Sequence, residues 1–173
     1  GAAVVLLLVS FGIEALLRVR ALRRDTAKRA RGEIAGLVRS ILTYYGVPLR
    51  HFRMRRFYRQ FVGADDLVFD IGAHVGNRVD ALRSLGTRVV AVEPQPGCVG
   101  ILRRLYGDDP AVTVIAGACG ATEAQTVMHI STAHPTLSTL SPDWSRSINE
   151  HYGELQIDWD RDVTVSTTTL DAL

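Results

Sequence analysis

A glycine-rich turn between two short apolar segments constrains this chain more than any other feature. Residues 67–71 (LVFDI) are rich in β-branched and aromatic side chains, which is typical of a buried parallel strand. The turn at residues 72–76 (GAHVG) leads into a helical pattern over residues 79–85, and Gly86 predicts the end of that helix. A second buried strand is predicted at residues 88–93 (RVVAVE). This order predicts a right-handed βαβ unit, the core of a doubly wound α/β sheet.

The spacing of acidic residues and glycines in this unit restricts the ligand that it can bind. Asp70 ends the first strand, Gly72 and Gly76 allow close approach of a ligand, and Glu93 ends the second strand. A carboxylate at that strand end can accept hydrogen bonds from both hydroxyls of a ribose. The pattern D-x-G-x-x-x-G is not the G-x-G-x-x-G of dinucleotide folds, so a nicotinamide-dependent dehydrogenase is disfavoured. A ligand with an amino-acid end and a ribose but no phosphate, such as S-adenosylmethionine (SAM), is favoured.

Two motifs resemble a known family. Residues 68–77 (VFDIGAHVGN) and 90–96 (VAVEPQP) are similar to the FkbM family of SAM-dependent methyltransferases, and the similarity covers residues 57–173. The resemblance implies a Rossmann-like class I methyltransferase fold with three core parallel strands in this chain. A further pair of strands is expected at residues 125–130 and 163–168. It also implies methyl transfer, usually to a hydroxyl oxygen of a sugar or natural product.

The resemblance further implies where SAM binds. It places the carboxypropyl end beside the glycine-rich turn and the ribose hydroxyls at Glu93. It places the adenine between Pro94-Gln95 on one side and Gly117-Ala118 on the other. The implied cofactor-binding residues are Asp70, Gly72, Ala73, His74, Gly76, Asn77, Glu93, Pro94, Gln95, Gly117 and Ala118. His74 stands where the family often has asparagine, and either side chain can donate a hydrogen bond.

Charge divides the chain into two parts. Residues 1–63 contain 13 lysines and arginines against 3 acidic residues, whereas residues 64–173 contain 7 against 15, which gives net charges of +10 and −8. We therefore predict a basic helical segment at residues 1–62 and a SAM-binding domain at residues 63–173. The family continues beyond Asp171 into an Asp-x-Glu-Gly element that is absent here, so we expect a C-terminally truncated domain.

The N-terminal segment begins with an apolar run over residues 2–13, followed by arginines and one lysine between Arg18 and Arg31. This run is shorter than the about 20 residues that span a bilayer, and the basic flank is typical of a cytoplasmic side. A remnant membrane anchor and a soluble helix packed on the domain or on a partner both remain open. A signal peptide fits poorly because the charges follow the apolar run. We expect a cytoplasmic location, with membrane-surface contact through residues 1–62 as an open interpretation.

Two further helices are predicted before the domain. Apolar residues lie on one helical face over residues 34–42, and residues 46–48 (GVP) end that helix. Residues 50–62 alternate arginines with aromatic residues. We interpret this second helix as lying over the edge of the following domain, with contact to an anionic surface as the alternative. Nucleic-acid binding is not expected, because no recognisable motif accompanies the arginines.

Other candidate groups are less specific. Cys98 and Cys119 lack metal-ligand spacing and predict a reduced setting. His129 and His134 lack a metal-ligand partner at helical spacing, so no metal site is expected. The hydroxyl-rich residues 134–141 either line an acceptor pocket or lie on the surface. The sequence identifies no catalytic base, and His74 is interpreted as a turn or ligand-proximal residue. We expect an O-methyltransferase with a small-molecule hydroxyl acceptor; the alternative is a non-catalytic module that binds SAM or a nucleoside, or a membrane-associated scaffold.

Overall fold

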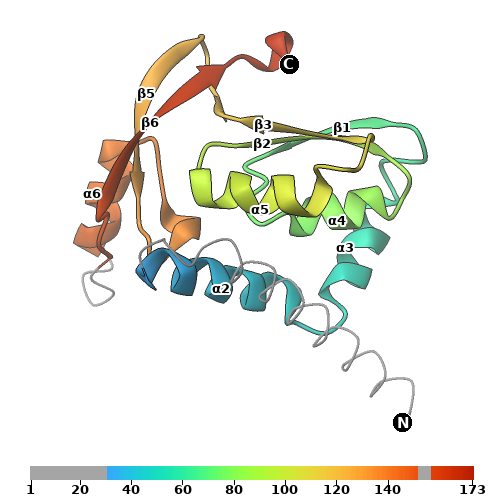
Figure 1. Ribbon diagram of the computed structural model, residues 1–173, viewed down its shortest axis with the longest axis horizontal. Coiled ribbons are helices and arrows are strands. Elements are labelled where there is room, and N and C mark those ends of the chain that lie inside the picture. Colours follow the sequence, from blue (N-terminus) through green and yellow to red (C-terminus); the bar gives the residue numbers. More distant parts are fainter. Residues whose placement is uncertain (1–30, 152–156) are drawn as a thin grey trace.

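The computed structural model describes residues 31–151 and 157–173, and its centre is a three-stranded parallel sheet (Figure 1). The strands are β1 (Leu67–Ile71), β2 (Arg88–Glu93) and β3 (Val112–Ala116), in the order β1-β2-β3. In the register, Ile71 pairs with Val92 and Glu93 pairs with Ala116. The predicted βαβ unit is confirmed, and its strands end together at the edge that carries the glycine-rich turn.

Two helices cover one face of this sheet: α4 (Asn77–Arg83) connects β1 to β2, and α5 (Pro96–Tyr106) connects β2 to β3 (Figure 1). Val79 and Leu82 of α4 pack with Leu102 of α5 in a buried core that includes two β2 side chains, Val89 and Ala91. The helix ends at Arg83 with Ser84 as its C-cap, earlier than predicted, and Gly86 with a φ of 85° lies in the turn that follows. Pro96 begins α5, where its missing N–H leaves no hydrogen bond unmade.

The expected α/β class is confirmed, but a doubly wound sheet is not found within the described residues. Right-handed crossovers that proceed in one direction, β1 to β2 to β3, place both helices on the same face. Strand alternation directs Leu67, Phe69 and Ile71 to the opposite face, where they are 50%, 36% and 43% exposed. A doubly wound fold needs helices on that face as well.

A second three-stranded sheet follows β3. It contains β4 (Ala118–Cys119), β5 (Ala124–Ile130) and β6 (Arg161–Thr168) in the order β4-β6-β5, with β5 and β6 antiparallel. This confirms the expected strand pair. Short helices connect and follow these strands: η1 (Pro135–Leu137), α6 (Pro142–His151) and η3 (Leu170–Ala172).

The two described helices that precede the sheet differ in burial. α2 (Arg31–Tyr45) is amphipathic as predicted, and its Leu37, Ile41 and Tyr45 share a buried core with Val75 and residues of α5. Figure 1 shows α2 passing below α5 and reaching η1, in agreement with its contacts to both.

The second of these helices, α3 (Arg50–Tyr58), contacts α4 but has no buried residue. Within the described part of the chain, no helix has the length and apolar character needed to cross a bilayer. The interpretations of residues 2–13 and of the basic residues up to position 30 lie outside the described residues.

Candidate functional site

The turn after β1 has an unusual backbone. Gly72, His74 and Gly76 all have positive φ values, of 73°, 52° and 84°. The amides of Gly72 and Ala73 both donate to the carbonyl oxygen of Val92, which attaches the turn to the end of β2. Glycine adopts this region readily, and histidine is among the few other residues enriched in it. The turn therefore brings the backbone N–H of His74 to the carboxylate of Glu93.

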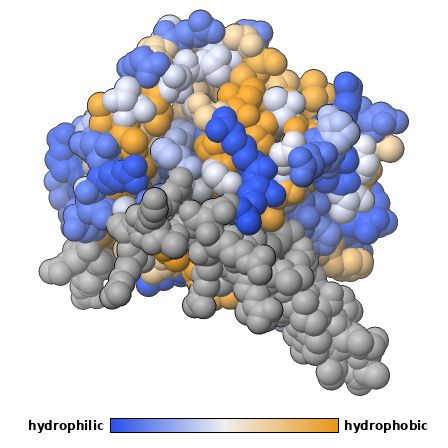
Figure 2. Space-filling model, in the orientation of Figure 1, coloured by the Kyte–Doolittle hydropathy of each residue, from blue (hydrophilic) through white to orange (hydrophobic). Residues whose placement is uncertain are grey.

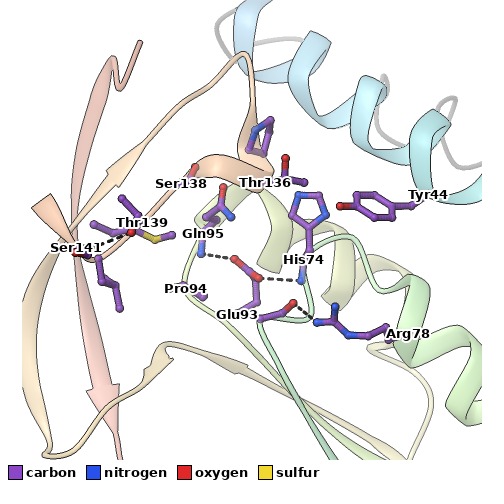
Figure 3. A pocket seen from close by; sticks show the side chains of 14 residues that line it. Tyr44, His74, Arg78, Glu93, Pro94, Gln95, Thr136, Ser138, Thr139 and Ser141 are labelled. Carbon is purple, nitrogen blue, oxygen red and sulfur yellow. Dashed lines mark hydrogen bonds between the residues drawn. The ribbon is translucent and has the colours of Figure 1, made fainter. Parts of the chain in front are cut away.

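Glu93 is a buried carboxylate with a fixed orientation. Its side chain is 2% exposed, Oε2 accepts a hydrogen bond from the His74 amide, and Oε1 accepts one from the Gln95 amide, both at 2.8 Å (Figure 3). Burial raises the pKa of Glu93 above its usual value, and the two amide hydrogen bonds offset only part of this increase. Each carboxylate oxygen can accept more than one hydrogen bond, so this oriented group is a candidate acceptor for ligand hydroxyls.

Asp70 is paired with Arg78, a residue that sequence reasoning missed. Arg78 Nε donates to Asp70 Oδ1 at 2.6 Å, and Arg78 Nη2 donates to the carbonyl oxygen of Gly72. Burial raises the pKa of Asp70 above its usual value, and the Arg78 guanidinium offsets only part of this increase. Asp70 Oδ2 is buried and has no hydrogen-bond partner among the described residues. The only sequence signal was an arginine eight positions after the aspartate. This spacing indicates an ion pair only when the path of the intervening turn is known.

The imidazole of His74 is buried and neutral. It is 9% exposed, and neither ring nitrogen has a hydrogen-bond partner within the described residues. Burial, together with the nearby Arg78 charge, lowers the pKa of His74 to about 4. The ring of Tyr44, from α2, meets the imidazole edge-on, with 5.4 Å between centroids (Figure 3). Tyr44 was also missed, because residues 34–42 showed only an apolar periodicity.

These groups face a cavity of about 490 Å³. The glycine-rich turn contributes Gly72 and His74 to one wall, and Glu93 with the next two residues continues it. The opposite wall is the segment after β5, which contributes hydroxyl and apolar side chains (Figure 3). Those side chains are Pro135, Thr136, Ser138, Thr139, Leu140 and Ser141. The hydroxyl-rich segment therefore lines a pocket, one of the two placements left open by the sequence.

The predicted cofactor residues separate into two groups. Those that line the cavity are Gly72, His74, Glu93, Pro94 and Gln95. Those that do not are Asp70, Ala73, Gly76, Asn77, Gly117 and Ala118.

The second group has other contacts. Ala73 is in the helix-covered core, and Asn77 Nδ2 donates to Met54 Sδ at 3.8 Å. The amide of Gly117 donates to the Glu93 carbonyl oxygen, and Ala118 pairs with β6. These positions contribute to the packing and pairing behind the walls.

The chemistry of the site is that of a polar organic ligand. Within residues 31–151 and 157–173, no cluster of three or more histidine, cysteine or acidic side chains has the arrangement of a metal site. The acids of the site instead bind an arginine and backbone amides.

Comparison with protein families agrees with this geometry. Residues 70–173 match the model described as the methyltransferase FkbM domain, and the match begins at the strand-end Asp70. A search of curated proteins found no match. The family match covers more than half of the chain and includes the turn, Glu93 and both cavity walls. The chain belongs to the FkbM family of methyltransferase domains.

Proposed function

We propose that this cavity binds SAM and that the chain transfers its methyl group to a hydroxyl oxygen of a sugar or natural-product acceptor. One observation carries the proposal. The buried Glu93 carboxylate lies at the end of β2, is oriented by two backbone amides, and lines the cavity. Such a group suits a vicinal pair of ribose hydroxyls.

The cavity fits a ligand of this size and polarity. Pockets for small ligands and cofactors have volumes of roughly 300–1,000 Å³, and this one has about 490 Å³. His74 presents two buried ring nitrogens without protein partners on its wall. Buried polar atoms are usually hydrogen-bonded, so these atoms support a polar ligand in the cavity.

Each wall residue has a physical role in this proposal. Glu93 would accept from the ribose hydroxyls, and Gly72 would allow close approach of the amino-acid end. Arg78, which lines the cavity, would offer its positive charge to the carboxylate of that end, and Asp70 would orient Arg78 from behind the wall. Pro94 and Gln95 would border the adenine, as the family resemblance implies. When bound, SAM supplies a methyl group on a sulfonium, which is an activated leaving group.

The acceptor is proposed to enter along the segment after β5. Thr136, Ser138, Thr139 and Ser141 supply hydroxyls that can donate and accept, while Leu140 supplies an apolar contact. This mixture suits a sugar or another molecule with several hydroxyl groups. Holding an acceptor oxygen in line with the transferable methyl group would supply much of the rate.

A non-catalytic SAM- or nucleoside-binding module is the second candidate, and His74 favours it. General bases work best when their pKa lies near the operating pH. The pKa of His74, the imidazole on the cavity wall, is about 4, so it is a weak base at neutral pH. Methyl-transfer assays with hydroxyl acceptors distinguish the two candidates, since only the first predicts turnover.

Calorimetric titration of the whole chain with SAM and with NAD tests the ligand. We expect SAM to bind and Glu93→Ala to abolish binding, with far-UV circular dichroism confirming that the variant is folded. Asp109→Ala is the matched control, because it removes a carboxylate that pairs with Arg83 and does not line the cavity. Binding of NAD alone, or unchanged SAM affinity in folded Glu93→Ala, would refute the proposal.

A further inference from the structure

Helix α3 lies on the outside of the molecule with one side against α4. The inner side is formed by Met54 and Tyr58, which are half-buried, and by His51, whose Nε2 lies 3.7 Å from Asp80 Oδ2. Apart from Arg50, which is half-buried and donates to the carbonyl oxygen of Thr43, the remaining residues of α3 are exposed, and none is buried. A helix this short and this exposed gains little from its own core contacts.

The exposed side of α3, together with Arg59 and Phe61 in the turn that follows it, combines large aromatic residues with arginines. Phe52, Phe57 and Phe61 are 57%, 54% and 68% exposed, and the rings of Phe57 and Phe61 lie 5.2 Å apart. Four exposed arginines lie between them in the sequence. We call the seven residues together the basic aromatic surface: Phe52, Arg53, Arg55, Arg56, Phe57, Arg59 and Phe61. Exposed apolar groups gathered in this way mark an interaction site.

Charge identifies the kind of partner. Residues 46–63 contain five arginines and no acidic residue, whereas residues 64–173 have a net charge of −8. Figure 2 shows hydrophilic and hydrophobic residues side by side at the right of the view, where α3 lies in Figure 1. The surface therefore matches a partner that is negatively charged at its face and apolar beneath it.

We propose that the basic aromatic surface docks the protein onto an anionic lipid bilayer. Arginine side chains can extend to lipid phosphates while their stems remain on apolar surface. Phenylalanine rings can enter the boundary between headgroups and acyl chains, as in amphipathic helices that lie in the membrane interface. A nucleic-acid duplex would match the arginines but leave the three phenylalanines in water, because its bases are already stacked on one another. This inference is independent of which ligand the cavity holds.

Sedimentation of the whole chain with lipid vesicles tests the proposal. One vesicle population contains only phosphatidylcholine, and the other has about one third phosphatidylglycerol. We expect binding to the anionic vesicles only, with weaker binding as salt rises from about 0.1 M towards 1 M, because the Debye length shortens from ~10 Å to ~3 Å. Equal binding to both vesicles, or no binding to either, would overturn the proposal.

Matched pairs of arginine substitutions locate the contact. An arginine near an anionic surface contributes about fivefold to partitioning, so Arg53→Gln with Arg56→Gln should weaken binding by about 25-fold. The control, Arg103→Gln with Arg146→Gln, removes the same charge from exposed positions on α5 and α6 and should retain wild-type binding. Equal effects of the two pairs would show general charge attraction and contradict a docking surface on α3.

Hydrogen exchange with and without vesicles gives a second readout at the surface itself. We expect anionic vesicles to protect the amides of residues 47–62, and Phe52→Ala with Phe61→Ala to reduce that protection in a folded variant. Protection confined to other segments would contradict the proposal. Displacement of the protein from vesicles by an equal phosphate concentration of duplex DNA would assign the surface to nucleic acid instead.

Discussion

At the scale of single residues, Gly72 and Gly76 share a backbone conformation but not an environment. Both have positive φ, at 73° and 84°. A Cβ on Gly72 would meet no atom within 4 Å, whereas a Cβ on Gly76 would lie 2.8 Å from Tyr106 Cε2 and 2.9 Å from Leu102 Cδ2. From the sequence alone, both glycines were expected for the same reason, close approach of a ligand. The structure shows that Gly76 also has a packing reason.

Alanine substitutions should separate these roles. Gly76→Ala combines left-handed strain of about 1–2 kcal/mol with overpacking of about 1–3 kcal/mol, so it should lower the free energy of unfolding by about 2–5 kcal/mol. Gly72→Ala should lower the free energy of unfolding only by the strain of about 1–2 kcal/mol. It should nevertheless weaken ligand binding, because Gly72 lines the cavity. Urea denaturation and SAM calorimetry measure the two effects. Equal stability losses would contradict this division.

The neutral imidazole of His74 predicts a specific pH dependence of stability. Its pKa is about 4 in the folded protein and about 6.5 when exposed, so the unfolded chain binds the proton first. Stability from this group is therefore complete above pH ~6.5 and is lost as pH falls towards 4, by about 3 kcal/mol in all. His74→Asn, which tolerates the same positive φ, should show a shallower decline in urea denaturation between pH 7 and pH 4. Parallel curves for the two proteins would refute the assignment.

The Asp70–Arg78 pair predicts a coupled effect of two substitutions. Asp70 is 5% exposed, so Arg78→Met leaves a buried carboxylate without its cation. Breaking fully buried pairs costs about 3–5 kcal/mol, but the Arg78 side chain is 37% exposed, and a loss of about 2 kcal/mol is expected. Adding Asp70→Asn should recover part of that loss. A double-mutant cycle measures the coupling, and strictly additive losses would argue against a stabilising pair.

At the scale of elements, local periodicity predicted what forms but not what it contacts. The apolar spacing over residues 34–42 predicted α2, and the apolar runs at 67–71 and 88–93 predicted β1 and β2. Periodicity reports the character of one face, which was sufficient for these elements. Tyr44 and Arg78 line the cavity but were not predicted to do so. An edge-on ring contact and an ion pair depend on how separate elements pack, which local periodicity does not report.

The same limit explains the difference in sheet architecture. The turn and strands indicated a βαβ unit correctly, yet nothing in Leu67, Phe69 or Ile71 specifies that their face lacks a helix layer within the described residues. A buried parallel strand and a half-exposed one can have the same composition over five residues. Layer order is a property of the connections between elements, which sequence patterns constrain weakly.

At the scale of the whole molecule, α2 and the sheet domain share a core. Ile41 and Leu37 of α2 are 1% and 3% exposed and belong to one buried cluster with Val75 of the glycine-rich turn and with Cys98 of α5. Glu33 of the same helix pairs with Arg161 of β6. The division into a basic segment at residues 1–62 and a domain at residues 63–173, which was based on charge, stays a prediction. The packing leads us to expect that α2 unfolds together with the domain.

Ile41→Ala tests this expectation against a control on the same helix. Removing a buried isoleucine side chain costs about 2–5 kcal/mol, and the loss should appear equally in far-UV circular dichroism and in the fluorescence of Trp144 and Trp159, which lie beyond β5. Leu42→Ala, at a residue 51% exposed, should change stability by less than about 1 kcal/mol. If α2 were an independent unit, Ile41→Ala would alter part of the dichroism and leave the tryptophan transition in place. Coincident, shifted transitions would instead establish that the helix preceding the domain helps to hold the turn on which the cofactor is proposed to bind.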